Sequence, residues 1–117
     1  MNGFVNETLR CSPPAIRIYG HGTVRDITLS GVEIPRDAFL IFDVESAHYD
    51  PDAYPNPGQF EPTRSGPPNL AFGAGAHACV EVALARLVAK VLIDRLLRDY
   101  AMSPAGEARL RNSRDQY

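Results

Sequence analysis

An apolar stripe in the second half of the 117-residue chain constrains the fold more than any other sequence feature. Its members recur at intervals of three and four residues: Val80, Leu84, Leu87, Val88, Val91, Leu92 and Leu96. Side chains at this spacing share one face of an α-helix, so the sequence predicts an amphipathic helix that runs to about Tyr100. Any fold of this chain has to accommodate a long helix in its second half.

A glycine-rich segment leads directly into this helix. It reads Phe72-Gly73-Ala74-Gly75-Ala76-His77-Ala78-Cys79. Cys79 therefore falls at or next to the first turn, where unpaired backbone amides and the positive end of the helix dipole favour a thiolate. Gly73 and Gly75 let the backbone approach a flat, bulky ligand, and Phe72 can shield the sulfur from water. Taken alone, such a cysteine is more often a small buried residue at the start of a core helix.

Residues 1–10 predict the end of a helix. The segment Asn6-Glu7-Thr8-Leu9-Arg10 contains good helix formers, and Pro13 and Pro14 stop it, as expected for a helix whose beginning lies outside the chain. Glu7 and Arg10 are three residues apart, which makes them neighbours on a helix. Such a pair is most often a solvated surface contact worth ~0.3 kcal/mol, so the spacing alone gives it no special role.

Residues 15–42 predict a small antiparallel sheet. Residues 15–19 and 23–30 alternate apolar and polar side chains, and residues 31–37 have the composition of a turn. The run Phe39-Leu40-Ile41-Phe42 is continuously apolar, which is typical of a strand buried on both faces. Periodicity leaves a short buried helix open at the same position.

Residues 50–68 predict a long loop without regular structure, because prolines and glycines recur throughout the segment. Tyr54 and Phe60 are its candidate anchors, and long ordered loops often carry function. Residues 103–117 are polar and show no apolar stripe of their own.

Composition argues against several classes of function. Both signs of charge are mixed along the chain and the formal net charge is −2, so we expect no nucleic-acid partner. No apolar run approaches the roughly 18 to 20 residues of a membrane span, and the first residues lack a leader, so we expect a cytoplasmic protein without membrane contact. Cys11 and Cys79 lack the spacing of a disulfide framework and are expected to be reduced.

Three interpretations of the glycine-rich segment fit its residues poorly. A dinucleotide or phosphate loop would need a third glycine at fingerprint spacing or a lysine at the helix start. A zinc site would need C-x-x-C or H-x-x-x-H spacing, which the two cysteines and three histidines lack. A nucleophilic pair of Cys79 and His77 would need an orienting third group and an oxyanion hole, for which the sequence offers no candidate.

Five segments, in chain order, resemble the C-terminal part of the bacterial-type cytochromes P450. They are Glu7-Thr8-Leu9-Arg10 (the E-x-x-R helix), Gly31-Val32-Glu33-Ile34-Pro35 (the sheet hairpin), residues 50–60 (the meander), residues 72–79 (the cysteine-ligand loop) and Leu84-Ala85-Arg86 (the helix after the ligand). The resemblance implies an α+β, mainly α fold: an E-x-x-R helix end, a small antiparallel sheet, a meander, a ligand loop and a long proximal helix. Residues 1–117 would then form a partial cytochrome P450 domain, truncated at the N-terminus and at the C-terminus.

The resemblance also implies a function and a cofactor. The chain would be a fragment of a haem-thiolate monooxygenase that binds haem b (iron protoporphyrin IX). The complete enzyme would be an oxidoreductase that incorporates oxygen into an organic substrate and takes electrons from a ferredoxin-type redox partner. The distal helix of the family has no counterpart here, so we expect no catalytic residue in this chain and no monooxygenase activity from the chain alone. The alternative is a non-catalytic P450-like remnant or accessory protein.

Site residues follow from the resemblance position by position. Cys79 would be the proximal thiolate and the metal ligand, His77 a hydrogen-bond donor to a haem propionate, and Phe72, Gly73 and Gly75 part of the loop around the cofactor. The arginine of the family that reaches a propionate has no clear counterpart here; the nearest candidates are Arg17 and His21, of which we favour His21. The structural residues would be Glu7, Arg10 and Gln59.

At two positions the sequence differs in charge from the family that it resembles. Gln59 stands where we expect the meander arginine that completes the group of Glu7 and Arg10, so a charge-assisted hydrogen bond would become a neutral one, about half as strong. Glu81 stands where the family has a glycine, which adds bulk and negative charge two residues after the ligand.

Overall fold

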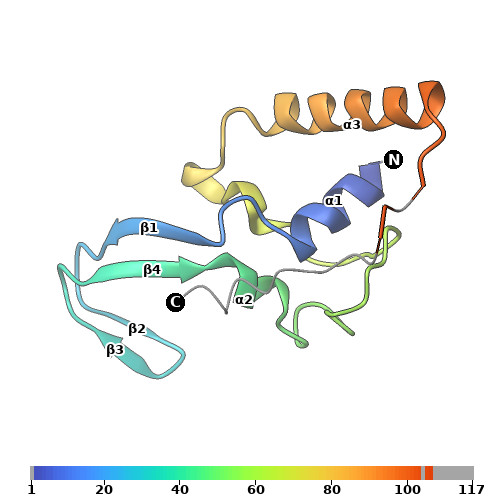
Figure 1. The fold of residues 1–117 in the computed structure, drawn as a ribbon. Helices are drawn as coiled ribbons and strands as arrows, with labels where there is room; N and C mark the ends of the chain where they lie inside the picture. Colours follow the sequence, from blue (N-terminus) through green and yellow to red (C-terminus); the bar gives the residue numbers. More distant parts are fainter. Residues whose placement is uncertain (1, 104, 107–117) are drawn as a thin grey trace.

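The computed structural model of the chain describes residues 2–103, 105 and 106 (Figure 1). Its helices and strands are α1 (Asn2–Cys11), β1 (Arg17–Gly22), β2 (Ile27–Leu29), β3 (Val32–Ile34), β4 (Phe39–Asp43), α2 (Val44–His48), η1 (Leu70–Phe72), η2 (Gly75–His77) and α3 (Val82–Asp99), where η marks a 3₁₀-helix. The predicted order of a helix, antiparallel strands, a long loop and a long helix is confirmed, and with it the α+β class. Most of the polar tail from residue 103 onward lies outside the described residues.

Helix α1 ends where the sequence predicts. Its last backbone bond runs from the amide of Ser12 to the carbonyl of Thr8 over 2.9 Å, and Pro13 and Pro14 have no amide hydrogen to continue the ladder. Arg10 lies in the last turn, where a cation suits the negative end of the helix dipole.

The four strands form two separate two-stranded sheets, β1 with β4 and β2 with β3, both antiparallel (Figure 1). The β2 to β3 hairpin turns at Ser30 and Gly31, which both have positive φ angles (49° and 81°), as a tight hairpin turn requires. The register between β1 and β4 shifts between Ile18 and His21, where Gly20 has a φ of 87°. The predicted antiparallel pairing is confirmed, but the strands do not join into a single sheet.

The prediction that residues 39–42 form a strand buried on both faces is wrong. β4 is a strand, but Phe39 is 66% exposed and Ile41 is 53% exposed. A two-stranded ribbon needs a covering layer on each face, and the described part of the chain does not provide one for these side chains. The apolar side chains of β4 therefore form a surface that the described part of the chain leaves uncovered.

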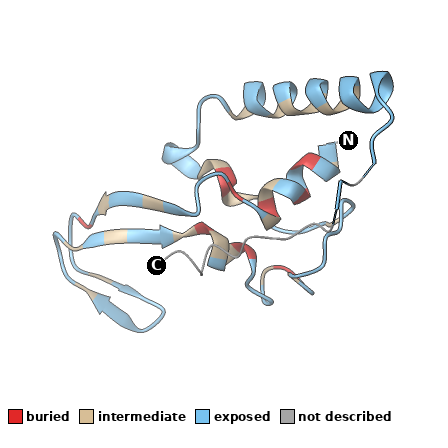
Figure 2. Ribbon diagram, viewed as in Figure 1, coloured by how far each residue is buried: buried red, intermediate tan, exposed pale blue. Residues whose placement is uncertain are grey.

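The buried centre of the molecule lies where α1, α2, η1 and the long loop meet (Figure 2). Its buried apolar residues are Val5, Val44, Tyr54 and Ala71. Its buried polar or charged residues include Glu7, Arg10 and His48, and Arg10 and His48 are the largest side chains that are fully buried. Hydrogen bonds and ion pairs must therefore organise this centre as much as apolar packing does.

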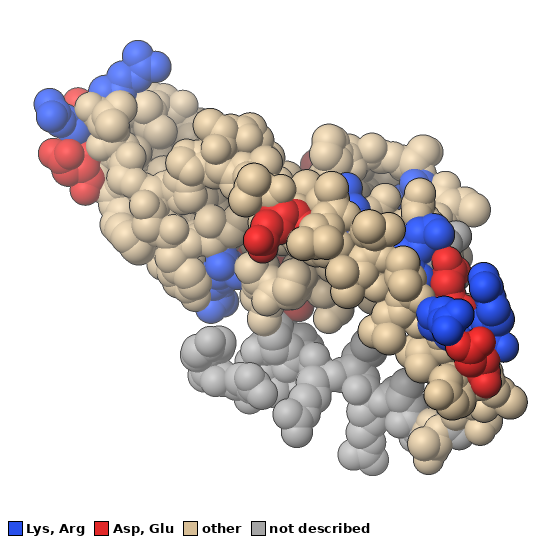
Figure 3. Space-filling view, turned by 90° about the horizontal axis from the view of Figure 1, so that it is seen from above, with Lys and Arg blue, Asp and Glu red and all other residues tan. Residues whose placement is uncertain are grey.

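Helix α3 follows the predicted stripe, from Val82 to Asp99, and packs against α1 (Figure 1). None of its residues is buried, and Leu84, Leu87 and Val91 are each more than half exposed. From above, charged side chains gather at the two ends of the molecule, and the largely uncharged surface between them carries an acidic group near its middle and scattered basic groups (Figure 3). The predicted helix is confirmed, while most of its apolar face remains open.

Residues 50–68 form the predicted loop without regular structure. Tyr54 is buried and its hydroxyl donates to the carbonyl of Pro68 over 3.3 Å. Phe60 packs edge-on against Phe4 of α1, with ring centroids 5.5 Å apart. Gly3 of α1 touches the loop so closely that a Cβ atom there would overlap the carbonyl of Pro62. Phe60 therefore ties the loop to α1, and Tyr54 ties it to α2, because the Tyr54 ring also stands edge-on to His48 at 5.9 Å.

Candidate cofactor site

The segment from Leu70 to Cys79 is a compact loop that presents Cys79 next to helix α3. Asn69 caps η1, with its side-chain oxygen accepting from the amide of Ala71 over 2.8 Å. The amide of Cys79 donates to the carbonyl of Phe72 over 2.8 Å, which closes the loop. Cys79 is exposed and lies three residues before α3 begins at Val82. Cys79 is therefore outside the packed core, unlike the buried cysteine that this position would hold most often.

The two glycines of this loop differ in what an added side chain would meet. Gly73 has a φ of 73°, and a Cβ atom there would lie 2.7 Å from the carbonyl oxygen of His77. The loop's own backbone therefore requires glycine at this position. Gly75 also has a positive φ, 59°, but an added Cβ would meet open space. Only Gly75 matches the expectation of a glycine that leaves room for a ligand.

A cavity of about 460 Å³ opens beside this loop, between it and the sheet of β1 and β4. Its lining includes Ile18, Ile41, Phe42, Val44 and Leu70, together with Gly73, Ala74 and His77 of the loop and His21 of β1. The cavity is thus mainly apolar and carries two imidazole rings and the carboxylate of Asp43, which is paired with Arg17. A flat apolar group could lie against such a lining with a polar edge directed toward the histidines.

His21 and His77 come together although 56 positions separate them in the sequence. Their rings meet edge to face with centroids 4.6 Å apart, and His21 also packs against Phe42 at 5.1 Å. The Nδ1 atom of His21 is buried and has no hydrogen-bond partner among the described residues. A buried polar atom of this kind calls for a ligand group to satisfy it. Exposed sulfur, an apolar cavity and an unsatisfied imidazole nitrogen fit the residues that a haem with acidic propionates requires.

Glu7 and Arg10 form the predicted pair, and it is buried. Arg10 Nη2 and Nε donate to Glu7 Oε1 and Oε2 over 2.8 and 3.0 Å. Arg10 also donates to the carbonyls of His48 and Pro57, each over 2.8 Å. The hydrogen bonds from Arg10 lower the pKa of Glu7 from 4.5 to about 2, against the effect of burial and with help from the amide of Glu61. The pair thus joins α1 to α2 and to the loop of residues 50–68.

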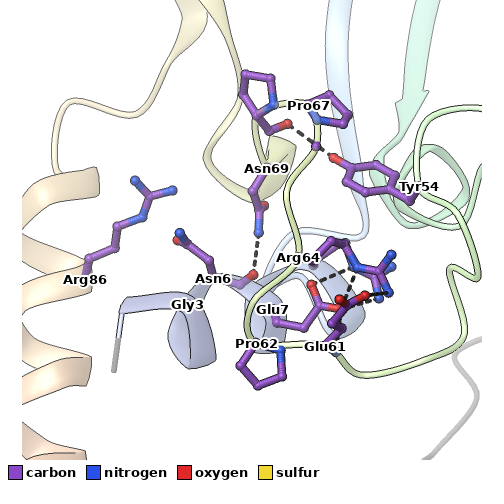
Figure 4. Close-up of a pocket in the computed structure, with 13 residues that line it drawn as sticks. Gly3, Asn6, Glu7, Tyr54, Glu61, Pro62, Arg64, Pro67, Asn69 and Arg86 are labelled. Carbon is purple, nitrogen blue, oxygen red and sulfur yellow. Dashed lines mark hydrogen bonds and ion pairs between the residues drawn. The ribbon is translucent and has the colours of Figure 1, made fainter.

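The expected role of Gln59 needs correction, because Arg64 completes this group. Arg64 Nε donates to Glu7 Oε1 over 3.0 Å, and Arg64 is almost fully buried (Figure 4). Among the described residues, the contribution of Gln59 is its backbone carbonyl, which accepts from Arg64 over 2.7 Å and from Arg10 over 3.4 Å. The charge-assisted bond is therefore kept. A sequence signal was available: Arg64 is the only basic residue between positions 50 and 68.

Two further residues of the site were missed in the sequence. His48 is completely buried between α1 and η1. Arg86 of α3 lies with its guanidinium 5.7 Å from the ring centroid of Phe72, which links α3 to the cysteine loop. Arg86 also borders a second cavity, of about 380 Å³, into which it points from α3 toward Asn6 of α1 (Figure 4). His48 is a lone histidine without a distinguishing sequence pattern, whereas Arg86 belongs to the segment that resembles the helix after the ligand but was given no role in the site.

Glu81, the second expected departure, lies at the N-cap of α3 and is exposed. Its side chain makes no capping hydrogen bond there. A carboxylate at the positive end of a helix dipole is favourable for the helix. The exposed glutamate is therefore compatible with the start of helix α3.

Comparisons with known proteins agree with this geometry. The family model described as Cytochrome P450 matches residues 1–116. Cytochrome P450 144 of Mycobacterium tuberculosis is 43% identical over 99 residues, which are 83% of this chain and 22% of that protein. Human steroid 21-hydroxylase is 34% identical over 113 residues, which are 92% of this chain and 23% of that protein. The chain thus spans less than a quarter of the length of these curated relatives.

Solved structures show the same likeness. Ligand-free cytochrome P450 TbtJ1 superposes with a TM-score of 0.79 and 31% identity over 85% of this chain and 26% of that one. CYP109E1 from Bacillus megaterium in complex with testosterone gives a TM-score of 0.82 and 26% identity, over 97% of this chain and 32% of that one.

The fold and the relatives together define the class as that of haem proteins of the P450 type. The chain belongs to the cytochrome P450 family. Membership implies a haem cofactor. Among residues 2–103, 105 and 106, no helix is long and apolar enough to span a bilayer.

Proposed function

We propose that this chain is the proximal, haem-binding part of a cytochrome P450 monooxygenase and that Cys79 is the thiolate ligand of the iron. The observation that carries the proposal is the exposed Cys79 at the end of a glycine loop that borders the apolar cavity through Gly73, Ala74 and His77. A cysteine held by its backbone amide and turned away from the core is available to a metal, whereas a packed one is not.

Each neighbouring residue has a separate task in this proposal. His21 and His77 would hold the propionates, because their rings meet at the edge of the cavity and His21 Nδ1 lacks another partner among the described residues. Phe72 would shield the sulfur, and Arg86 would hold the ring of Phe72 from the side of α3. When bound, haem b would supply the redox centre for inserting oxygen into an organic substrate.

Glu7, Arg10 and Arg64 act at a distance from the cofactor, as positioning residues. Their ion pairs connect α1 to the loop of residues 50–68, and Arg10 reaches the carbonyl that ends α2. Rigid support of this kind keeps a ligand loop in one geometry, which a metal site requires.

A haem titration with matched variants tests the proposal. The purified chain is titrated with haem and the bound fraction is followed by visible absorption, with Cys79→Ala as the test and Cys11→Ala as the control. We expect Cys79→Ala to lose the thiolate type of spectrum and at least about tenfold in affinity, since a lost metal ligand costs more than a lost supporting group. Cys11 lies in α1, next to Arg10, and its substitution should leave the titration unchanged. Equal titrations for both variants would contradict the assignment of Cys79.

We propose further that the chain alone does not turn over substrate. It spans less than a quarter of the length of the curated relatives given above, and its long helix α3 follows Cys79 and lies on the proximal side in this proposal. Oxygen activation and the electrons from a ferredoxin-type redox partner would belong to the complete enzyme. With haem and hydrogen peroxide, product should stay at the level of free haem. Product above that level that disappears in Cys79→Ala would overturn this statement.

A non-catalytic P450-like remnant or accessory protein is the second candidate, and Glu81 is the observation that favours it. A carboxylate two residues after Cys79 adds negative charge near an anionic ligand. Purified protein that stays colourless after haem is supplied would support this second candidate. Recovery of haem binding in Glu81→Gly would identify the glutamate as the cause.

A further inference from the structure

His48, at the end of α2, makes two hydrogen bonds with its ring although it is completely buried. Nδ1 lies 3.1 Å from the carbonyl oxygen of Arg10, and Nε2 lies 2.9 Å from the amide nitrogen of Leu70. A backbone amide only donates, so Nε2 must accept and Nδ1 must carry the proton that it donates to Arg10. The contacts therefore require a neutral ring in one tautomer.

We propose that His48 is a pH-sensitive positioning residue that clamps the start of the cysteine loop to the end of α1 while its ring is neutral, and releases the loop when the ring is protonated. The importance of the loop for haem rests on the proposed function above. The clamp itself depends only on contacts of this chain and can be measured without haem.

The clamp acts on the segment that presents Cys79. Leu70 is the first residue of η1, and the carbonyl of Phe72, two residues later, accepts from the amide of Cys79. The preceding residue, Asn69, is fixed separately by a 2.7 Å bond from its side chain to the carbonyl of Asn6. Loss of the bond to His48 would thus free the turn between Asn69 and Cys79 and leave its anchor on α1 in place.

Protonation would place a hydrogen on Nε2, facing the amide hydrogen of Leu70. Two donors would then meet, and the bond could not survive. Burial lowers the pKa of His48 below its usual value, the nearby Arg10 charge also lowers it, and Glu7 together with the Arg10 carbonyl opposes them. The folded ring therefore resists protonation more than an unfolded one. The stabilisation from His48 is complete above about pH 6.5 and is lost as the pH falls through the lower folded pKa.

The groups around His48 come from several elements. From α1 these are Glu7 and Arg10, whose guanidinium donates to the carbonyl of His48 over 2.8 Å. From the long loop, the ring of Tyr54 stands edge-on at 5.9 Å. The residues of η1 are apolar. The other titratable residues on α2, at its two caps or on the elements that pack against it are Cys11, Arg17, Tyr19, His21, Asp43, Glu45 and Tyr49.

Two substitutions separate the two bonds of the ring. In His48→Gln, the longer side chain carries an amide oxygen near the position of Nε2, where it can accept from Leu70 at any pH. In His48→Asn, the amide nitrogen takes the position of Nδ1, so the bond to Arg10 is kept and the bond to Leu70 is lost. Neither variant titrates near neutral pH.

The test is amide hydrogen exchange of the full chain without haem, expressed as protection factors between about pH 7.5 and pH 5.5. In the unsubstituted chain, the Leu70 and Cys79 amides should lose about tenfold or more in protection on acidification, the equivalent of one lost hydrogen bond, while amides of α1 keep theirs. His48→Gln should remove this pH dependence, and His48→Asn should leave both amides weakly protected at every pH. Ring nitrogen chemical shifts should report the Nδ1–H tautomer at neutral pH.

Three results would overturn the clamp: an Nε2–H tautomer, unchanged protection of Leu70 on acidification, or parallel loss of protection in the loop and α1, which would indicate global unfolding. Failure of Cys79 to bind haem would remove the proposed function and leave the exchange result standing. Haem binding through Cys79 with a pH-independent loop would remove only the clamp.

Discussion

The buried cluster around Glu7 and the exposed helix α3 are held in place in opposite ways (Figure 2). In the cluster, Arg10 and Arg64 both pair with Glu7, and they donate to backbone carbonyls at the end of α2 and in the loop of residues 50–68. In α3, exposed pairs such as Lys90 with Asp94 and Arg95 with Asp99 link residues four positions apart. The cluster is therefore specified by long-range partners, and α3 by local periodicity.

This difference sets the cost of a substitution. Removal of one partner from a buried ion pair leaves an uncompensated charge and costs about 3 to 5 kcal/mol. An exposed pair four positions apart on a helix contributes about 0.3 to 0.5 kcal/mol. We therefore expect a substitution in the buried cluster to lower the free energy of unfolding by about ten times as much as a substitution of similar size on α3.

The largest effect is expected from Arg10→Ala. This substitution leaves Glu7 buried beside a single arginine and removes the bonds to the carbonyls of His48 and Pro57. We expect the free energy of unfolding to fall by about 3 to 5 kcal/mol in urea titrations followed by circular dichroism. Arg95→Ala, in an exposed pair on α3, is the matched control and should cost less than about 0.5 kcal/mol. Similar losses in both variants would remove the distinction between the regions.

Acid should weaken the cluster through Glu7. Its pKa is lowered from 4.5 to about 2, so its contribution is complete above pH 4.5 and is lost as the pH falls toward 2. A shift of this size corresponds to about 3 kcal/mol. The difference in unfolding free energy between the unsubstituted chain and Glu7→Gln should therefore be largest near neutral pH and shrink below pH 4.5. A constant difference across this range would show that the arginine partners do not lower the pKa of Glu7.

Arg64→Ala and Gln59→Ala provide a sharper comparison within the long loop. Arg64 is a nearly buried cation on Glu7, whereas Gln59 supplies only its carbonyl, which alanine also has. We expect Arg64→Ala to cost about 2 kcal/mol or more in thermal or urea unfolding. Gln59→Ala should stay within about 0.5 kcal/mol. A larger loss of stability in Gln59→Ala than in Arg64→Ala would show that Gln59, and not Arg64, is the third member of the group with Glu7 and Arg10.

A small effect on stability is also expected on the open face of α3. Leu87→Ser removes an apolar side chain that is 56% exposed, so the unfolding free energy should change by less than about 1 kcal/mol. The same substitution should reduce self-association in sedimentation experiments, because exposed apolar area promotes it. A loss as large as that of a core leucine would show that α3 is packed more tightly than its exposure indicates.

The sequence predicted those parts of the fold that depend on neighbours along the chain. The stripe from Leu84 to Leu96 gave α3, and prolines and glycines gave the end of α1 and the long loop. The positions that it missed depend on distant partners: Arg64 meets Glu7 across 57 positions, and His48 meets Arg10 and Leu70 from the middle of the chain. Residues 39–42 were assigned to the correct element but to the wrong environment, because apolarity alone does not say which segment covers a strand.

The most direct test of the central claim, that Cys79 binds haem iron, is the visible spectrum of the reduced protein with carbon monoxide. The purified chain is supplied with haem, reduced and exposed to carbon monoxide, in parallel with Cys79→Ala and Cys11→Ala. We expect the Soret shift of a thiolate-ligated haem in the unsubstituted chain and in Cys11→Ala, and its absence in Cys79→Ala. A thiolate-type shift that persists in Cys79→Ala, or a chain that never acquires the shift although it binds haem, would contradict the account.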